Sequence, residues 1–180
     1  MTPSPHAEPA PTRRKTLAWT TAAVAAAAGA GVAWWSQRPD AGAVAVQALW
    51  SQRFDTPDGQ PLDWRAVRGT GPLLINFWAT WCPPCVAELP LLDRFGQAHA
   101  AAGWRVLGLA VDQPSAVRRF LANRPVSFAI GMAGLQGTDL SRTLGNAQGG
   151  LPFTVVVAAN GQVLHRKIGQ ISESDLASWL

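Results

Sequence analysis

The chain has few residues of the kinds that hold metals or attach haem. Its 180 residues include only two cysteines, Cys82 and Cys85, and three histidines at scattered positions. A structural zinc site needs about four closely spaced ligands, and these residues do not provide that spacing. Attachment of a c-type haem needs a histidine directly after the second cysteine, where this chain has Val86. We therefore expect no metal site and no cofactor.

Charged side chains are also scarce, at 14% of the sequence, and tyrosine is absent. The formal net charge is +4, and several of the basic residues lie near the N-terminus, at Arg13, Arg14, Lys15 and Arg38. From Val44 onward there are 11 basic and 9 acidic residues, which leaves a charge of only +2. The basic stripe that would bind a phosphate backbone is missing, so we expect no nucleic-acid partner.

The N-terminal region has the pattern of a membrane-targeting segment. Residues 1–16 are rich in proline and end in the basic cluster, which indicates a disordered tail. Residues 17–35 carry no charge, and as a helix rising about 1.5 Å per residue they would span roughly 28 Å, close to the ~30 Å of a bilayer core. We expect a transmembrane anchor over 17–35, a linker over 36–47 and one folded domain over 48–180.

A cleaved export signal is the alternative for the same segment. It is rich in alanine and glycine rather than leucine, and Ala41-Gly42-Ala43 offers a small-x-small cleavage site downstream. With an anchor, the basic cluster predicts a cytoplasmic N-terminus and a folded domain on the far side of the membrane. Whether the segment is an anchor or a cleaved signal, the folded part leaves the cytoplasm and enters a compartment where disulfides persist.

The folded part alternates extended and helical patterns. We expect strands over 49–54, 73–79, 104–111 and 128–130, and a hairpin over 153–158 and 162–168 that turns at Asn160-Gly161. We expect helices over 63–67, 82–102, 115–124, 138–144 and 172–180. The segment 73–79 is continuously apolar, as in a central strand covered on both faces. The order of elements indicates one α/β domain.

The two cysteines lie in Trp81-Cys82-Pro83-Pro84-Cys85, between the apolar strand and the next helix. Only a thiolate attacks a disulfide, and a helix N-terminus stabilises negative charge on a nearby sulfur. We therefore expect Cys82 to be the exposed nucleophile and Cys85, one turn inward, to resolve the mixed disulfide. A purely structural disulfide would close too short a loop to constrain the unfolded chain much.

The segment Phe77-Trp-Ala-Thr-Trp-Cys-Pro-Pro-Cys85 resembles the active-site signature of thioredoxin-fold proteins. More narrowly, it resembles the membrane-tethered TlpA/ResA-like thiol–disulfide oxidoreductases, which include cytochrome c maturation reductases. The resemblance implies a thioredoxin-like α/β fold, in which helices flank a central mixed β-sheet and an N-terminal β-hairpin extends it. It also implies a domain outside the inner membrane of a bacterium, in the periplasm, or an exported soluble protein if the signal is cut.

A second element, Gly150-Leu151-Pro152-Phe153-Thr154, matches the same fold. The resemblance implies that Pro152 is cis and faces the two sulfurs, while the preceding backbone pairs with an extended substrate peptide. It implies that the substrate is bound by Trp81, Pro83, Leu151 and Pro152.

An acidic residue near the cysteines is the third candidate for the chemistry. Glu88 follows Cys85 by three residues, so the two share a helix face. In the ResA-like branch a glutamate at the matching position influences proton transfer, and a general acid/base is needed for the thiols. Asn76 stands where thioredoxin has a buried acid, and an amide cannot titrate. The alternative for Glu88 is a solvated acid in the first turns of a helix.

The expected function is reduction of disulfides in exported proteins, with apocytochrome c as a candidate substrate and a membrane thiol reductase as electron donor. The alternative is a copper metallochaperone that uses the same cysteine pair. Soft Cu(I) sites recruit methionine as well as cysteine, and the only methionine beyond Met1 is Met132.

Overall fold

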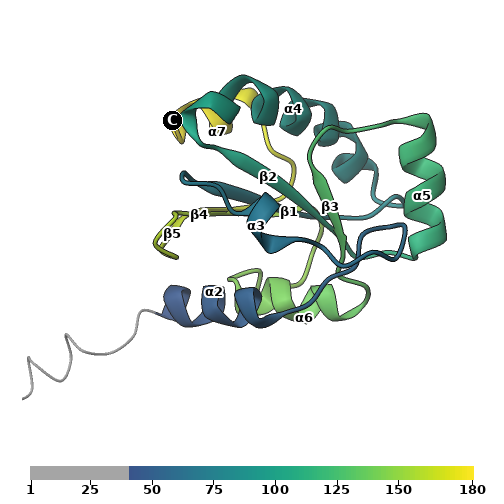
Figure 1. Ribbon diagram of the computed structural model, residues 1–180, viewed down its shortest axis with the longest axis horizontal. Helices are drawn as coiled ribbons and strands as arrows, with labels where there is room; N and C mark the ends of the chain where they lie inside the picture. The colour runs from purple at the N-terminus through teal and green to yellow at the C-terminus, as the bar shows by residue number, and fades with distance from the viewer. Residues whose placement is uncertain (1–40) are drawn as a thin grey trace, which may run out of the picture. The chain divides into compact units, whose positions relative to one another are not determined.

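The computed structural model describes residues 41–180, in which one mixed sheet is the centre (Figure 1). Its strands are β1 (Leu73–Trp78), β2 (Arg105–Ala110), β3 (Ala129–Met132), β4 (Phe153–Val157) and β5 (Val163–Ile168). They lie in the order β3-β2-β1-β4-β5; β1, β2 and β3 are parallel, and β4 runs antiparallel to both of its neighbours. The expected central mixed sheet is confirmed.

Helices cover both faces of this sheet. They are α2 (Ala41–Ser51), α3 (Trp64–Val67), α4 (Pro83–His99), α5 (Pro114–Asn123), α6 (Gln136–Thr143) and α7 (Glu173–Ser178). Figure 1 shows α4 and α7 together on one face and α2 and α6 on the other. A sheet covered in this way has a core on each side, which is why the central strand is apolar in nearly every position.

The alternation of side chains along β1 divides the two cores. Leu73, Ile75 and Phe77 belong to the cluster that includes α2, whereas Leu74 belongs to the cluster that includes α4. Because successive side chains of a strand point to opposite faces, Asn76 must point to the α4 side together with Leu74. A polar residue is therefore buried beneath the helix that carries the cysteines.

The expected strand over 49–54 is wrong, because α2 continues to Ser51. Alanine-rich sequence favours a helix, and Val46 and Leu49 are fully buried in the core next to the sheet. The helix also takes up residues 41–47 of the expected linker. The hairpin extension is short: the Asp55 and Pro61 backbones form one antiparallel bridge across the turn at Gly59.

The expected anchor over 17–35 and the tail over 1–16 lie outside the described residues. Among residues 41–180, no helix is both long enough and apolar enough to cross a membrane.

Candidate active site

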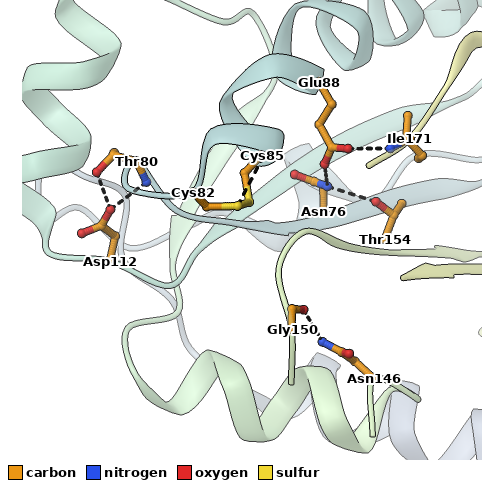
Figure 2. Close-up of a disulfide and its surroundings, with 10 residues drawn as sticks. All are labelled: Asn76, Thr80, Cys82, Cys85, Glu88, Asp112, Asn146, Gly150, Thr154 and Ile171. Carbon is orange, nitrogen blue, oxygen red and sulfur yellow. Dashed lines mark hydrogen bonds between the residues drawn. A yellow bond between two sulfur atoms is a disulfide. The ribbon is translucent and has the colours of Figure 1, made fainter. Parts of the chain in front are cut away.

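Cys82 and Cys85 form a disulfide at the start of α4, with an S–S distance of 2.04 Å and a Cα–Cα distance of 5.3 Å (Figure 2). Cys82 is the N-cap residue, with an extended backbone, and Cys85 lies in the first turn. Cys85 is fully buried and Cys82 is only 5% exposed. The sulfur that we expected to be exposed is thus largely covered in the oxidised state, because both cysteines pack with Trp78 and Leu89.

The two prolines between the cysteines decide which helix donors can reach the sulfur. Pro83 and Pro84 occupy the first two helical positions and have no N–H. The Cys85 N–H donates to Cys82 Sγ at 3.3 Å, and the Val86 N–H donates to the Cys82 carbonyl. Among the backbone N–H groups of the first helical turn, only that of Cys85 therefore donates to the Cys82 sulfur.

Glu88 is 1% exposed, and its side chain projects from α4 toward β1, where it meets Asn76. Its Oε1 accepts a hydrogen bond from Asn76 Nδ2 at 2.7 Å, and its Oε2 accepts one from the Ile171 N–H at 2.7 Å. The same Asn76 Nδ2 donates to Thr154 Oγ1 at 3.0 Å (Figure 2). The structure therefore rejects the alternative of a solvated acid and places Glu88 in a buried polar network.

Burial raises the pKa of Glu88 from 4.5 to about 7, because the charged form loses its hydration. The hydrogen bonds from Ile171 and Asn76 act in the opposite direction and moderate the rise. A carboxyl group with a pKa near neutrality can both take and give a proton under physiological conditions. Glu88 is therefore a candidate acid–base group of this site.

Two side chains anchor the loops that flank the disulfide. Asp112, two residues after the end of β2, accepts hydrogen bonds from the Thr80 N–H at 2.8 Å and the Thr80 hydroxyl at 2.6 Å. The fully buried Asn146 donates to the Gly150 carbonyl at 2.8 Å (Figure 2). These bonds tie the loop before Cys82 to β2 and the loop before Pro152 to the end of α6.

The peptide bond between Leu151 and Pro152 is cis, as predicted. Trp81, which is 66% exposed, and the half-buried Leu151 line one groove of about 820 Å³ together with Asp112 and Leu135. Neither cysteine lines this groove, but Leu151 also packs against the cluster that holds both of them. The expected substrate residues do not all meet there. Pro83 is exposed and Pro152 is buried, and neither lines this groove.

Comparisons with known proteins agree with this geometry. The sequence profile of the family described as Redoxin matches residues 39–180. The chain belongs to the Redoxin family. Relatives of this Redoxin chain include the thiol-disulfide oxidoreductase ResA of Bacillus cereus, 26% identical over 124 residues, which make up 68% of this chain and 69% of ResA.

Two further similarities narrow the assignment. The thiol:disulfide interchange protein DsbE of Vibrio cholerae is 32% identical over 105 residues, covering 56% of this chain and 52% of DsbE. The crystal structure of a thioredoxin-related protein from Neisseria meningitidis serogroup B superposes with a TM-score of 0.61 at 29% identity, covering 71% of this chain and 94% of that chain. This Redoxin member is a TlpA/ResA-like thiol–disulfide oxidoreductase with a close cysteine pair.

Four residues around this site were not apparent from the sequence: Thr154, Asp112, Asn146 and Ile171. Thr154 could have been found, because a hydroxyl interrupts the apolar run of β4 opposite Asn76. Asp112 follows a buried strand, which is a frequent position for functional side chains. The Ile171 amide gave no local signal, because its acceptor Glu88 is 83 residues away in the sequence. Asn146 bonds within its own loop, to the Gly150 carbonyl four residues later, and no motif pointed to it. Within residues 41–180, no three histidine, cysteine, aspartate or glutamate residues gather as a metal site would require.

Proposed function

We propose that this oxidoreductase reduces disulfides of exported proteins, with Cys82 as attacker and Cys85 as resolver. The observation that carries the proposal is the cysteine pair at the N-terminus of α4, with Leu151 packed against the cluster that holds both cysteines and lining a groove with Trp81. Leu151 precedes the cis-proline, and no hydrogen bond within the described residues engages its backbone N–H or carbonyl. An extended polypeptide can pair with such free backbone groups.

The exchange proceeds in two balanced steps. The Cys82 thiolate attacks one sulfur of the substrate disulfide; a mixed disulfide forms, and the other substrate sulfur leaves as a thiolate that takes up a proton. Glu88 then accepts the proton of the Cys85 thiol, and the Cys85 thiolate attacks Cys82 Sγ. The second substrate sulfur leaves as a thiolate and takes up a proton, so the substrate departs as a dithiol and the chain is left oxidised, as in this structure.

Reduction must be renewed by a donor, and we propose a thiol reductase of the membrane for that step. By resemblance, the substrate is an apocytochrome c whose haem-binding thiols must stay reduced. The proposed location is the inner membrane of a bacterium, with residues 17–35 as the anchor and the described domain in the periplasm. The mass of the mature protein tests this: loss of the residues before about position 44 would mean a cleaved signal instead.

Mixed-disulfide trapping tests the proposed roles directly. In Cys85→Ser the resolving thiol is absent, so we expect a stable covalent complex with an oxidised apocytochrome peptide, seen by mass spectrometry and reversed by dithiothreitol. Cys82→Ser is the matched control and should form no complex. A complex in Cys82→Ser instead would exchange the two roles.

The direction of electron flow requires a separate measurement. We expect the reduction potential of the pair to lie well below the redox poise of its compartment, which makes the reduced protein a reductant. A potential well above that poise would make it an oxidant. Retention of one Cu(I) per chain without any reductase activity would favour the metallochaperone.

A further inference from the structure

The buried network around Glu88 contains one atom without a partner. Asn76 is fully buried, its amide nitrogen donates to both Glu88 and Thr154, and its Oδ1 accepts from nothing among the described residues. A buried polar atom without a hydrogen bond costs about 1–3 kcal/mol, so it calls for an explanation. The explanation lies in what happens when its neighbour Glu88 takes up a proton.

The geometry determines which carboxyl oxygen of Glu88 can carry that proton. Oε2 faces the Ile171 N–H, a backbone donor that has no second orientation, so Oε2 must remain an acceptor. The proton therefore belongs on Oε1, which faces the amide nitrogen of Asn76 at 2.7 Å. In the observed orientation two donors would then point at each other, and the hydrogen bond between them would be lost.

A half-turn of the Asn76 amide removes this conflict. The turned amide places Oδ1 where Nδ2 was, so it can accept from the Glu88 Oε1–H and also from the Thr154 hydroxyl, which can donate as well as accept. The network then keeps as many hydrogen bonds as before, with the amide nitrogen unpaired in place of Oδ1. Both states have the same number of satisfied groups.

We propose that Asn76 is a positioning residue with two amide orientations, which keeps Glu88 hydrogen-bonded both as a carboxylate and as a carboxylic acid. Because the network has the same number of hydrogen bonds with either amide orientation, Glu88 can gain or lose a proton without the loss of a hydrogen bond. Burial raises the pKa of Glu88 to about 7, so both states are populated near neutral pH. In thiol exchange, the amide would turn each time the proton arrives or leaves.

The charged groups on the surrounding elements have partners of their own, and none forms a hydrogen bond or ion pair with Glu88 or Asn76 among the described residues. β1 and β4 carry no charged side chain, and the cross-strand neighbour of Thr154 on β5 is Lys167, which forms an ion pair with Asp175 of α7 at 2.9 Å. His165 on β5 stacks on Trp179, and Glu173 of α7 lies near Arg94 of α4. Histidine is the side chain whose charge changes most readily near neutral pH, so His165→Gln serves as a background for the titration below.

Nuclear magnetic resonance of the full chain tests the proposal. The chain has three glutamates and four asparagines, so selective labelling with ¹³C-glutamate and ¹⁵N-asparagine yields few signals. We expect the Asn76 side-chain amide signals to change with pH at the midpoint of the Glu88 carboxyl signal, in the native sequence and in His165→Gln. Asn146 is the internal control, since it is equally buried with an unpaired Oδ1 but its amide donates to a hydroxyl and a carbonyl, neither of which titrates.

Glu88→Gln extends the test, because glutamine has a single side-chain oxygen. That oxygen must accept from the Ile171 N–H, so the new amide nitrogen faces Asn76 and donates to it. Asn76 is then held in its turned orientation at every pH. We expect its signals in this variant to match those of the native chain at low pH and not to titrate. Thr154→Ser keeps the hydroxyl and should keep the titration.

Asn76→Ala distinguishes a turning amide from a fixed donor. If the amide turns, its loss removes a hydrogen bond from both forms, and the Glu88 midpoint should move by less than about one pH unit. An amide with a fixed orientation would donate a hydrogen bond to the carboxylate form alone. Its loss would then raise the Glu88 midpoint by more than about one pH unit. That larger rise, or Asn76 signals that stay constant through the Glu88 titration, would overturn the proposal.

The consequence for exchange rests on the proposed function of Glu88, whereas the titration needs neither substrate nor electron donor. Failure of the trapping experiment would therefore leave the two-state amide intact, and a static Asn76 would leave the oxidoreductase activity intact.

Discussion

Glu88→Gln should make the protein more stable at high pH. The side chain is 1% exposed, and its pKa rises from 4.5 to about 7 because burial penalises the charge. Folding therefore favours the protonated form. The contribution of Glu88 to stability is complete below pH 4.5 and falls as the pH rises to about 7, since in that window the native state holds a proton that the unfolded state has released.

The magnitude follows from the pKa difference. One pKa unit corresponds to about 1.4 kcal/mol, so ionising Glu88 in the native state costs about 3 kcal/mol in total. Glutamine has nearly the same shape, carries no charge and can still accept from the Ile171 N–H. The free energy of unfolding of Glu88→Gln, relative to the native chain, should therefore rise by about 3 kcal/mol between about pH 4 and pH 8.

Urea unfolding of the oxidised protein at several pH values measures this difference. Glu173→Gln is the matched control, because the Glu173 side chain is 83% exposed and should show almost no pH-dependent difference. A Glu88→Gln difference that stays constant across this pH range would refute the reasoning, since Glu88 would then have the same pKa in both states. A difference that falls with pH would mean that the native state favours the carboxylate.

Two further substitutions test the packing and the loop that carry the site. Gly108→Ala should lower the free energy of unfolding by about 1–3 kcal/mol in urea, because a Cβ there would lie 2.7 Å from Ile130 Cδ1 and 3.0 Å from Trp78 Nε1. Asp112→Ala should cost about 1–3 kcal/mol by the same measurement, because the Thr80 N–H and hydroxyl both lose their acceptor.

Each of these has a control elsewhere in the chain. Gly150→Ala places its Cβ within 4 Å of nothing, so it should leave stability nearly unchanged. Asp139→Ala removes an exposed ion pair with Arg142 and should cost less than about 1 kcal/mol. If Gly108→Ala proved as mild as Gly150→Ala, the close packing between β2 and its neighbours would be disproved.

The elements of the domain were largely predictable, because their signals are local. The apolar run at β1 and the Asn160-Gly161 turn depend on residues close in sequence. The strand expected over 49–54 failed for the opposite reason. Trp50 and Phe54 favour a strand, but burial of Val46 and Leu49 against the sheet stabilises a helix, and that burial comes from distant segments.

The sequence by itself determined the reactive pair, its place at a helix start and the proline loop, since Trp81-Cys-Pro-Pro-Cys85 and Leu151-Pro152 are short patterns with their own chemistry. Only the tertiary structure decided what surrounds them. Asn76, Glu88 and Ile171 are far apart in the chain, and the sheet register and the packing of α4 bring them within hydrogen-bonding distance. A pKa depends on burial and on partners in space, so the change of Glu88 into an acid that titrates near neutrality is a property of the fold.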